Sequence, residues 1–204
     1  ESILAQKRST LVFATSASAS KVINAYHLFL QQVYDEVGYD VEVMRLPVIR
    51  SYIHADIEKV DGILISTQNL VKEYPNVLTV PTPLRQVHLS AFSIDKKIRI
   101  DGPESLQQYK IGIIRGYILS RQITEGMDRQ IVNSYESLAS LLKIKRVDII
   151  LALKLEMERF IAGRPEFNEI KTIEPPISSL TMHHFLNKKH EALVPVVSRI
   201  IERL

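Results

Sequence analysis

The chain has 204 residues, of which 46% are hydrophobic and 24% are charged, ordinary proportions for a globular protein that buries a core. Its net charge of +3 comes from 26 basic and 23 acidic residues mixed along the chain, so we expect no nucleic-acid partner. No apolar run approaches the ~18 residues of a membrane span, and the absence of cysteine excludes disulfides, thiolate metal sites and thiol catalysis.

The first ninety residues predict the element order β-α-β-α-β, which favours a parallel sheet with helices on its faces. The strands are short apolar runs, and the first helix carries apolar residues at helical spacing along one face until Gly38 ends it. The second helix begins at Pro47, a residue that suits the first turn. In chain order, the expected elements are strand 10–15, helix 21–37, strand 40–46, helix 47–59 and strand 62–65.

A similar order recurs in the second half of the chain, after a short strand, a longer alternating strand and a short helix. The final segment has apolar residues on one helical face, and we expect it to pack back on the first half. The expected elements are strands 77–80 and 87–94, helix 103–109, strand 111–114, helix 117–125, strand 131–133, helix 135–143, strand 147–151, helix 153–162, strand 169–173 and helix 191–204.

We interpret the repeated order as two α/β lobes of similar size. Residues 1–88 and 178–204 would form the first lobe, and residues 89–177 the second. The chain would cross between the lobes twice, and Ile63 and Ile113 would lie in separate sheets. A ligand is then expected in the cleft between the lobes, with closure of the cleft by a hinge motion.

Three segments suggest a known family: VDGILIST at 60–67, KIGIIRGYILSRQ at 110–122 and KRVDIILAL at 145–153. In the second segment a strand runs into Gly116, which can adopt a backbone conformation closed to other residues, so that the following N–H groups suit a small polar molecule. These segments resemble the type 2 periplasmic solute-binding proteins, closest to extracellular solute-binding family 3, which serves polar amino acid uptake. That family shares a G-[IV]-x-x-G-[TY] turn and a later G-[RK]-V-D strand. The patterns LPVIRS, DG and YPN further resemble a divergent orphan branch of it.

The resemblance implies an α/β, two-lobed periplasmic binding protein-like fold of type 2, with the ligand cleft between the lobes. Hydroxyls of Ser66 and Thr67 would hydrogen-bond a ligand carboxylate. Alternatively, or at the same time, they could cap a helix over 68–72. In open α/β sheets ligands collect beyond the carboxyl ends of the strands. The expected ligand-binding residues are Ser16, Ser18, Arg50, Ser66, Thr67, Ser90, Arg115, Gly116, Tyr117, Ser134 and Tyr135.

Two arginines in this set have alternative interpretations. Arg115 opens the turn Arg115-Gly116-Tyr117, which matches the family turn except that Tyr117 stands where threonine is common. The alternative is an ordinary strand-to-helix turn with a surface arginine. Arg50 lies just inside the second expected helix, where it could turn towards the cleft or could simply be solvated.

Two positions depart from the family pattern for binding an α-amino acid. The arginine of a T-x-x-R motif, which clamps the ligand carboxylate, would follow Ser66, but Leu70 stands in its place. Asp148 matches the aspartate of G-R-V-D, which supports the hinge side of the strand. The second acid, which takes the ligand amine, is expected about four positions later, where the chain has Ala152. Both charge anchors are therefore absent.

Other chemistries lack a suitable set of residues. His183 and His184 are adjacent on an expected strand, so their side chains point to opposite faces, and the other histidines are scattered. We therefore expect no metal and no cofactor. No G-x-S-x-G elbow supports a hydrolase, and we expect that the protein is not an enzyme.

The leading interpretation is a monomeric periplasmic binding protein that captures a small polar or anionic solute for ABC-type uptake, with a permease as partner. Residues 1–10 lack the apolar region of a signal peptide, so an exported protein would have this as its mature or trimmed chain. One alternative is a ligand-sensing input domain for a membrane histidine kinase or cyclase. A lyase on the same fold lacks a convergent acid, base or nucleophile set. A LysR-type effector domain would need a helix-turn-helix before strand 10–15, where there is no room.

Overall fold

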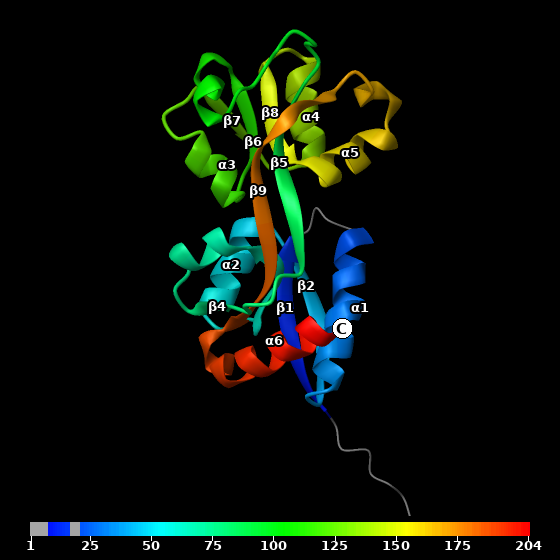
Figure 1. Ribbon diagram of the computed structural model, residues 1–204, viewed down its shortest axis with the longest axis vertical. Coiled ribbons are helices and arrows are strands. Elements are labelled where there is room, and N and C mark those ends of the chain that lie inside the picture. Colours follow the sequence, from blue (N-terminus) through cyan, green and yellow to red (C-terminus); the bar gives the residue numbers. More distant parts are fainter. Residues whose placement is uncertain (1–7, 17–20) are drawn as a thin grey trace, which may run out of the picture. The chain divides into compact units, whose positions relative to one another are not determined.

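The computed structural model describes residues 8–16 and 21–204 (Figure 1). The chain divides into two compact units, one made of Glu1–Leu84 with Met182–Leu204 and the other of Arg85–Thr181. Both combine strands with helices in α/β order.

Unit 1 is built on parallel strands: β1 pairs in parallel with β2 and with β3, whereas β9 runs antiparallel to β3 and β4. Its elements are β1 (Ser9–Ser16), α1 (Lys21–Asp35), β2 (Tyr39–Leu46), α2 (Val48–Asp56), β3 (Gly62–Thr67), the 3₁₀ helix η1 (Gln68–Lys72), β4 (Val77–Thr79), the end of β9 (Lys171–Asn187), the 3₁₀ helix η4 (Lys188–Leu193) and α6 (Val194–Arg203).

The core of unit 1 contains side chains from the first strand and helix and from the last helix. Leu11 and Phe13 of β1 pack in one buried cluster with Leu30 of α1 and with Val197 and Ile200 of α6. The final helix therefore packs on the first unit, as the sequence predicts. It is shorter than expected because η4 precedes it and a proline occupies its first turn.

Unit 2 contains the strand order β5-β8-β6-β7, in which β6 is parallel to both β7 and β8 and β5 is antiparallel to β8. Side chains alternate across the sheet, so Ile150 and Ala152 of β8 enter one core cluster and Ile149 and Leu151 another. Its elements are β5 (Arg85–Ser93), η2 (Pro103–Gln108), β6 (Ile111–Ile114), α3 (Ile118–Ile123), β7 (Arg129–Val132), α4 (Tyr135–Lys143), β8 (Ile149–Leu153), α5 (Lys154–Ala162), η3 (Pro165–Phe167) and the start of β9.

The expectation that Ile63 and Ile113 lie in separate sheets is wrong. The hydrogen-bonded strand order is continuous, β2-β1-β3-β9-β5-β8-β6-β7. The reason is that β9 is one strand of 17 residues, whereas the sequence predicts a strand over 169–173, a connection after it and a separate strand at His183 and His184. Pro175 and Pro176 lie within this strand, because proline φ is compatible with extended backbone.

Smaller differences concern the ends of elements. The segment 103–109 forms a 3₁₀ helix, η2, instead of an α-helix. The strand expected over 147–151 is β8, Ile149–Leu153, shifted by two residues at both ends. Directly before it, the backbone N–H of Asp148 donates to the carbonyl of Lys110.

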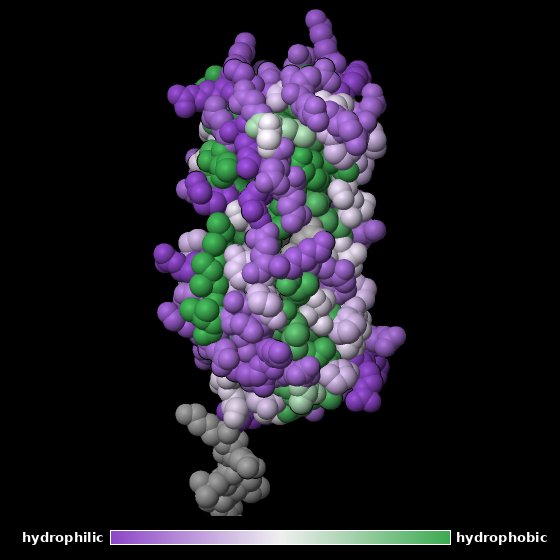
Figure 2. All heavy atoms as spheres, turned by 90° about the vertical axis from the view of Figure 1, so that its left-hand side faces the viewer, coloured by the Kyte–Doolittle hydropathy of each residue, from purple (hydrophilic) through white to green (hydrophobic). Residues whose placement is uncertain are grey.

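The surface is largely polar on the face in Figure 2, where hydrophobic side chains form narrower green bands between purple ones. Helix α2 contributes an apolar row at four-residue spacing: Ile49, Ile53 and Ile57 just beyond its end are 39%, 43% and 52% exposed. Among the described residues, no helix is long and apolar enough to cross a membrane.

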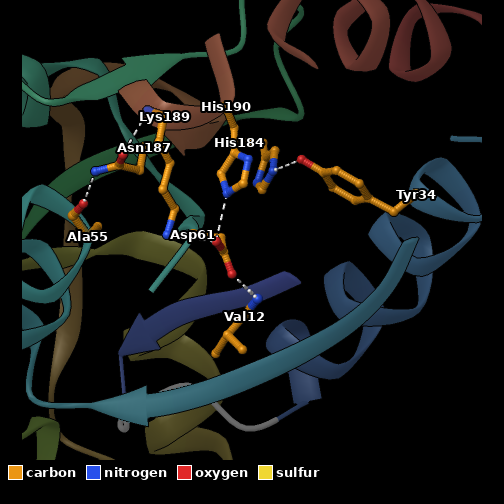
Figure 3. Close-up of polar contacts among 8 residues, drawn as sticks. All are labelled: Val12, Tyr34, Ala55, Asp61, His184, Asn187, Lys189 and His190. Atoms are coloured by element: carbon orange, nitrogen blue, oxygen red, sulfur yellow. Dashed lines mark hydrogen bonds and ion pairs between the residues drawn. The ribbon is translucent and has the colours of Figure 1, made fainter. Parts of the chain in front are cut away.

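A hydrogen bond between Tyr34 and His184 lies inside the core of unit 1 (Figure 3). The Nδ1 of His184 lies 3.0 Å from the carbonyl oxygen of Leu64, so it must donate, and Nε2 then accepts from the Tyr34 hydroxyl at 2.8 Å. Burial lowers the pKa of His184 to about 4, against the opposing effect of the Leu64 and Ile63 carbonyls. The ring is therefore neutral at pH 7.

This histidine is expected to make stability depend on pH. An unfolded histidine titrates near pH 6.5, so between pH 6.5 and 4 the unfolded chain binds a proton that the native chain does not. The contribution of His184 is fully present above pH 6.5 and falls by about 3 kcal/mol as the pH decreases to 4. Urea unfolding of the wild type and of His184→Asn over this range measures it.

The control is His88→Asn, because His88 is exposed and bonds only through Nδ1 to Ser179. His184→Asn should be less stable at pH 7 and should flatten the pH profile, whereas His88→Asn should keep the loss of stability that His184 causes between pH 6.5 and 4. An unchanged slope in His184→Asn would contradict the assignment.

Candidate functional site

In unit 1, the carboxyl end of β3 carries polar side chains from three elements. Ser66 is buried, and its hydroxyl lies 3.1 Å from the hydroxyl of Tyr52 on α2. The ring of Tyr52 lies 5.5 Å from the ring of Tyr74. The next residue, Thr67, takes the N-cap position of η1 but makes no side-chain cap hydrogen bond. Its hydroxyl is therefore not used in the helix cap that the sequence offered as an alternative.

Gln68 and His183 extend this strand end. The amide nitrogen of Gln68 lies 3.0 Å from Nε2 of His183, whose Nδ1 lies 3.0 Å from the carbonyl oxygen of Val80. His183 is buried, and it stands opposite Ser66 in the β3–β9 pairing. Gln68 is exposed.

Ser16 lies at the same edge of the sheet as Ser66, because β1 and β3 are parallel neighbours, whereas Arg50 makes no hydrogen bond to this group among the described residues. Arg50 is exposed, and its guanidinium has no hydrogen bond or ion pair with another described residue. Tyr52, two residues later, lies about 200° from Arg50 around the helix axis, so Tyr52 is the side chain of α2 that reaches Ser66. Ser16 ends β1, while Ser18 lies outside the described residues.

In unit 2, the turn after β6 has the geometry that its glycine allows. Gly116 has φ of 90°, a left-handed conformation that glycine adopts without strain. The Nε of Arg115 donates to the side-chain oxygen of Asn133 at 3.1 Å, and the Tyr117 hydroxyl lies 3.0 Å from that of Tyr135. The turn is therefore tied at two points to the end of β7 and the start of α4.

Tyr135 is the inner member of this tyrosine pair. Its ring stacks on Phe160 of α5 at a centroid distance of 6.2 Å. Burial and the neighbouring Tyr117 raise the pKa of Tyr135 well above its usual range, so the hydroxyl is a neutral donor and acceptor at physiological pH. Ser134 precedes it as the N-cap of α4, where its hydroxyl accepts from the Ser137 N–H.

Ser90, on β5, is fully buried, and its hydroxyl oxygen has no hydrogen-bond partner among the described residues. It stands opposite Ala152 in the β5–β8 pairing. A buried hydroxyl without a partner costs stability, and such groups tend to be retained for a reason other than folding. Ser90 is the member of the expected set with the clearest unused hydrogen-bonding capacity.

Replacing Ser90 with alanine tests this interpretation. Ser90→Ala should leave the free energy of unfolding unchanged or raise it by up to about 1 kcal/mol, because it removes an unsatisfied hydroxyl. The matched control is Ser93→Ala on the same strand. Ser93 Oγ donates to the carbonyl of Asp148 and accepts from the Asp95 N–H, so its loss should cost about 1–2 kcal/mol. Urea unfolding compares them, and a larger loss in Ser90→Ala would contradict the prediction.

The two positions where the family resemblance would place charged ligand-binding residues belong to the core in this chain. Leu70 of η1 and Ala152 of β8 are both fully buried. Asp148 has a structural contact, because its carboxylate accepts from the backbone N–H of Lys110 at 2.8 Å. A basic or acidic side chain at 70 or 152 would have to replace part of a hydrophobic core.

Sequence reasoning missed Tyr52, Gln68 and His183. Gln68 adjoins the predicted Ser66-Thr67 pair, so its position was a usable signal. His183 lies 115 residues from Gln68 along the chain, and no local pattern indicates their contact. Within residues 8–16 and 21–204, no three histidine or acidic side chains gather in a way that could hold a metal ion.

No protein-family model and no curated protein matches the chain. Solved structures do match. A histidine kinase sensor domain with similarity to periplasmic binding proteins has a TM-score of 0.80 at 15% identity, covering 98% of this chain and 92% of that chain. The arginine-bound form of truncated ArgBP from T. maritima has a TM-score of 0.76 at 13% identity, covering 95% of both chains.

An ancestral arginine-binding protein bound to glutamine has a TM-score of 0.75 at 15% identity, covering 97% of this chain and 92% of that chain. Identities this low establish the fold alone. The chain has the two-lobed α/β fold of the type 2 periplasmic binding proteins, which confirms the fold that the sequence resemblance implied.

Proposed function

We propose that the protein is an extracytoplasmic solute-binding protein that captures a small polar or anionic solute for ABC-type uptake. The observation that carries the proposal is the likeness of at least 95% of the chain to binding proteins and to a sensor domain of the same fold. Thr67 agrees with it, because its hydroxyl is unused in the cap of η1 and it lies at the carboxyl end of β3, where ligands collect in α/β sheets. Ser90 adds a buried hydroxyl without a partner among the described residues. We propose the residue set from the sequence as the site.

The amino acids named for the structural neighbours are poor candidates for this chain. The family resemblance assigns an arginine to the ligand carboxylate and an acid to the ligand ammonium group. This chain has Leu70 and Ala152 at those two positions, so both groups of an amino acid would lack a charged partner. Arg50 is an exposed cation without an assigned partner, and Arg115 keeps part of its guanidinium free beside Asn133. Either arginine suits an anionic solute that lacks an amine.

Native mass spectrometry of the freshly purified protein tests the proposal. We expect a mass excess of one small molecule that disappears on denaturation and that chemical analysis identifies as a polar or anionic solute. A thermal-shift screen of organic acids, sugars and amino acids is the second measurement. No retained solute and no stabilisation by any compound would refute the proposal.

A sensory role is the second candidate, and the similarity to the histidine kinase sensor domain favours it. Both roles require solute binding, so the binding assays do not separate them. Deleting the gene and measuring both solute uptake and transcription does. Lost uptake supports transport, while intact uptake with a lost transcriptional response supports sensing.

A further inference from the structure

A chain of hydrogen bonds runs from the backbone of unit 1 to the exposed side chain of Gln68. The Val80 carbonyl oxygen lies 3.0 Å from His183 Nδ1, and His183 Nε2 lies 3.0 Å from the amide nitrogen of Gln68. Only Gln68 is exposed, and it directly follows the polar strand end Ser66-Thr67.

The order of donors and acceptors in this chain is fixed. A carbonyl oxygen only accepts, so Nδ1 of His183 carries the proton and donates to Val80. The amide nitrogen of Gln68 only donates, so Nε2 of His183 accepts a hydrogen bond from it. Because the Gln68 amide points its NH₂ group at His183, its amide oxygen points away from the histidine. The backbone of Val80 therefore sets the orientation of the Gln68 side chain.

We propose that Gln68 presents its amide oxygen as a hydrogen-bond acceptor to the solute, and that the solute carries a hydroxyl or N–H donor for it. This inference rests on the proposed function. His183 is the positioning residue, since it acts on the solute only through Gln68. The proposed solute also carries an anionic group and lacks an amine. The preferred solute class is therefore a small hydroxylated organic acid.

The neighbouring groups agree with such a solute. Ser66 and Tyr52 share one hydrogen bond, and the hydroxyl of Thr67 is unused in the cap of η1. A hydroxy acid can donate to Gln68, whereas the corresponding oxo acid would place a carbonyl oxygen against the amide oxygen. Losing one hydrogen bond of this kind corresponds to about a tenfold change in affinity.

The first test needs no solute. Nitrogen-15 NMR of uniformly labelled protein should show His183 protonated at Nδ1 and unprotonated at Nε2. A scalar coupling across the N–H···N hydrogen bond should connect Gln68 to the ring. The Nε2-protonated tautomer, or the loss of the coupling, would overturn the orientation of Gln68.

The second test compares matched pairs of solutes by calorimetry: lactate against pyruvate, and 2-hydroxyglutarate against 2-oxoglutarate. We expect the hydroxy acid to bind about tenfold more tightly in any pair that binds. Gln68→Leu should reduce this ratio to about one. The control Gln107→Leu, at an exposed glutamine of unit 2, should keep it. Equal affinities in the wild type would overturn the inference.

His183→Phe separates positioning from direct contact. It should erase the preference for the hydroxy acid while leaving the oxo acid's affinity within about twofold, because the anionic group is held elsewhere. If this variant does not fold, the NMR result still decides the orientation. If neither pair binds, the solute found by native mass spectrometry decides. A retained solute without a hydroxyl or N–H group overturns the role of Gln68 but not the proposed function. The absence of any solute refutes the proposed function.

Discussion

None of the twenty common α-amino acids is expected to stabilise the protein at micromolar concentration. Binding a zwitterion in a closed site without charged partners costs several kcal/mol for each uncompensated ion. Each ~1.4 kcal/mol changes affinity tenfold, so micromolar binding should weaken to millimolar or disappear. The two positions at issue, Leu70 and Ala152, are fully buried core residues and cannot reorganise to supply charge. Thermal-shift screening at 10⁻⁵ to 10⁻² M solute, in order of magnitude, covers both regimes.

A panel of organic acids lacking an amine is the positive control for the same screen. The variant Leu70→Arg adds a second control, because restoring the expected charge does not restore the site. A guanidinium at a buried position should lower the melting temperature instead of creating amino acid binding. A clear shift with any common amino acid at micromolar concentration would contradict the prediction.

Several elements could be predicted closely because local signals agree. The helix α4 has the predicted ends, Tyr135 and Lys143, because Ser134 caps its start and its buried face repeats at helical spacing. The strand β6 is also as predicted, and Gly116 after it has the positive φ that only glycine adopts readily. Here propensity, pattern and tertiary environment favour the same structure.

The sequence was insufficient where long-range pairing decides. The strand β9 continues through Pro175 and Pro176 because pairing extends it, whereas local rules end a strand at such a pair. The Gln68–His183 contact and the Tyr52–Ser66 contact join separate elements, and helical phase alone could not show that Tyr52 faces Ser66. The fold class was predictable from the order of elements, but the polar contacts of the site were not.

The two units share one arrangement, in which the aspartate of a Val-Asp pair directly before a buried strand makes two hydrogen bonds to the backbone in or just ahead of the neighbouring strand. In unit 1, the Asp61 N–H donates to the carbonyl of Val12 at 2.7 Å and its carboxylate accepts from the Val12 N–H at 2.8 Å. In unit 2, Asp148 makes the same two bonds with Lys110, at 2.9 and 2.8 Å. Each aspartate thus fixes the alignment of two neighbouring parallel strands.

Asp61 has two further side-chain partners, Lys189 and His190 (Figure 3). Its second oxygen lies 2.6 Å from His190 Nε2 and 3.0 Å from Lys189 Nζ, so it also ties η4 to β3. Burial of the carboxyl opposes ionisation, but the hydrogen bonds from Val12, His190 and Lys189 outweigh it and lower its pKa. Its side chain is 16% exposed, whereas Asp148 is an exposed residue.

Asp61→Ala is therefore expected to destabilise unit 1 strongly, by about 3 kcal/mol or more. The substitution leaves the Val12 N–H without its acceptor, Lys189 without its counter-charge and His190 without its hydrogen-bond partner. Asp148→Ala is the matched control, because it breaks the equivalent backbone bond alone and should cost about 1 kcal/mol. Urea unfolding at pH 7 measures both.

The pH dependence separates the charge of Asp61 from its hydrogen bonds. Because its folded pKa is lowered from 3.8, its contribution is present above pH 3.8 and is lost as the pH falls through the folded value. Asp61→Asn should therefore be less stable than the wild type at pH 7, and the difference should shrink below pH 3.8. Hydrogen exchange should also increase in Lys188–Leu193 in this variant, since η4 is tied to β3 through the carboxylate. Equal losses in Asp61→Ala and Asp148→Ala would show that the backbone bond alone matters and that the contacts to Lys189 and His190 contribute nothing.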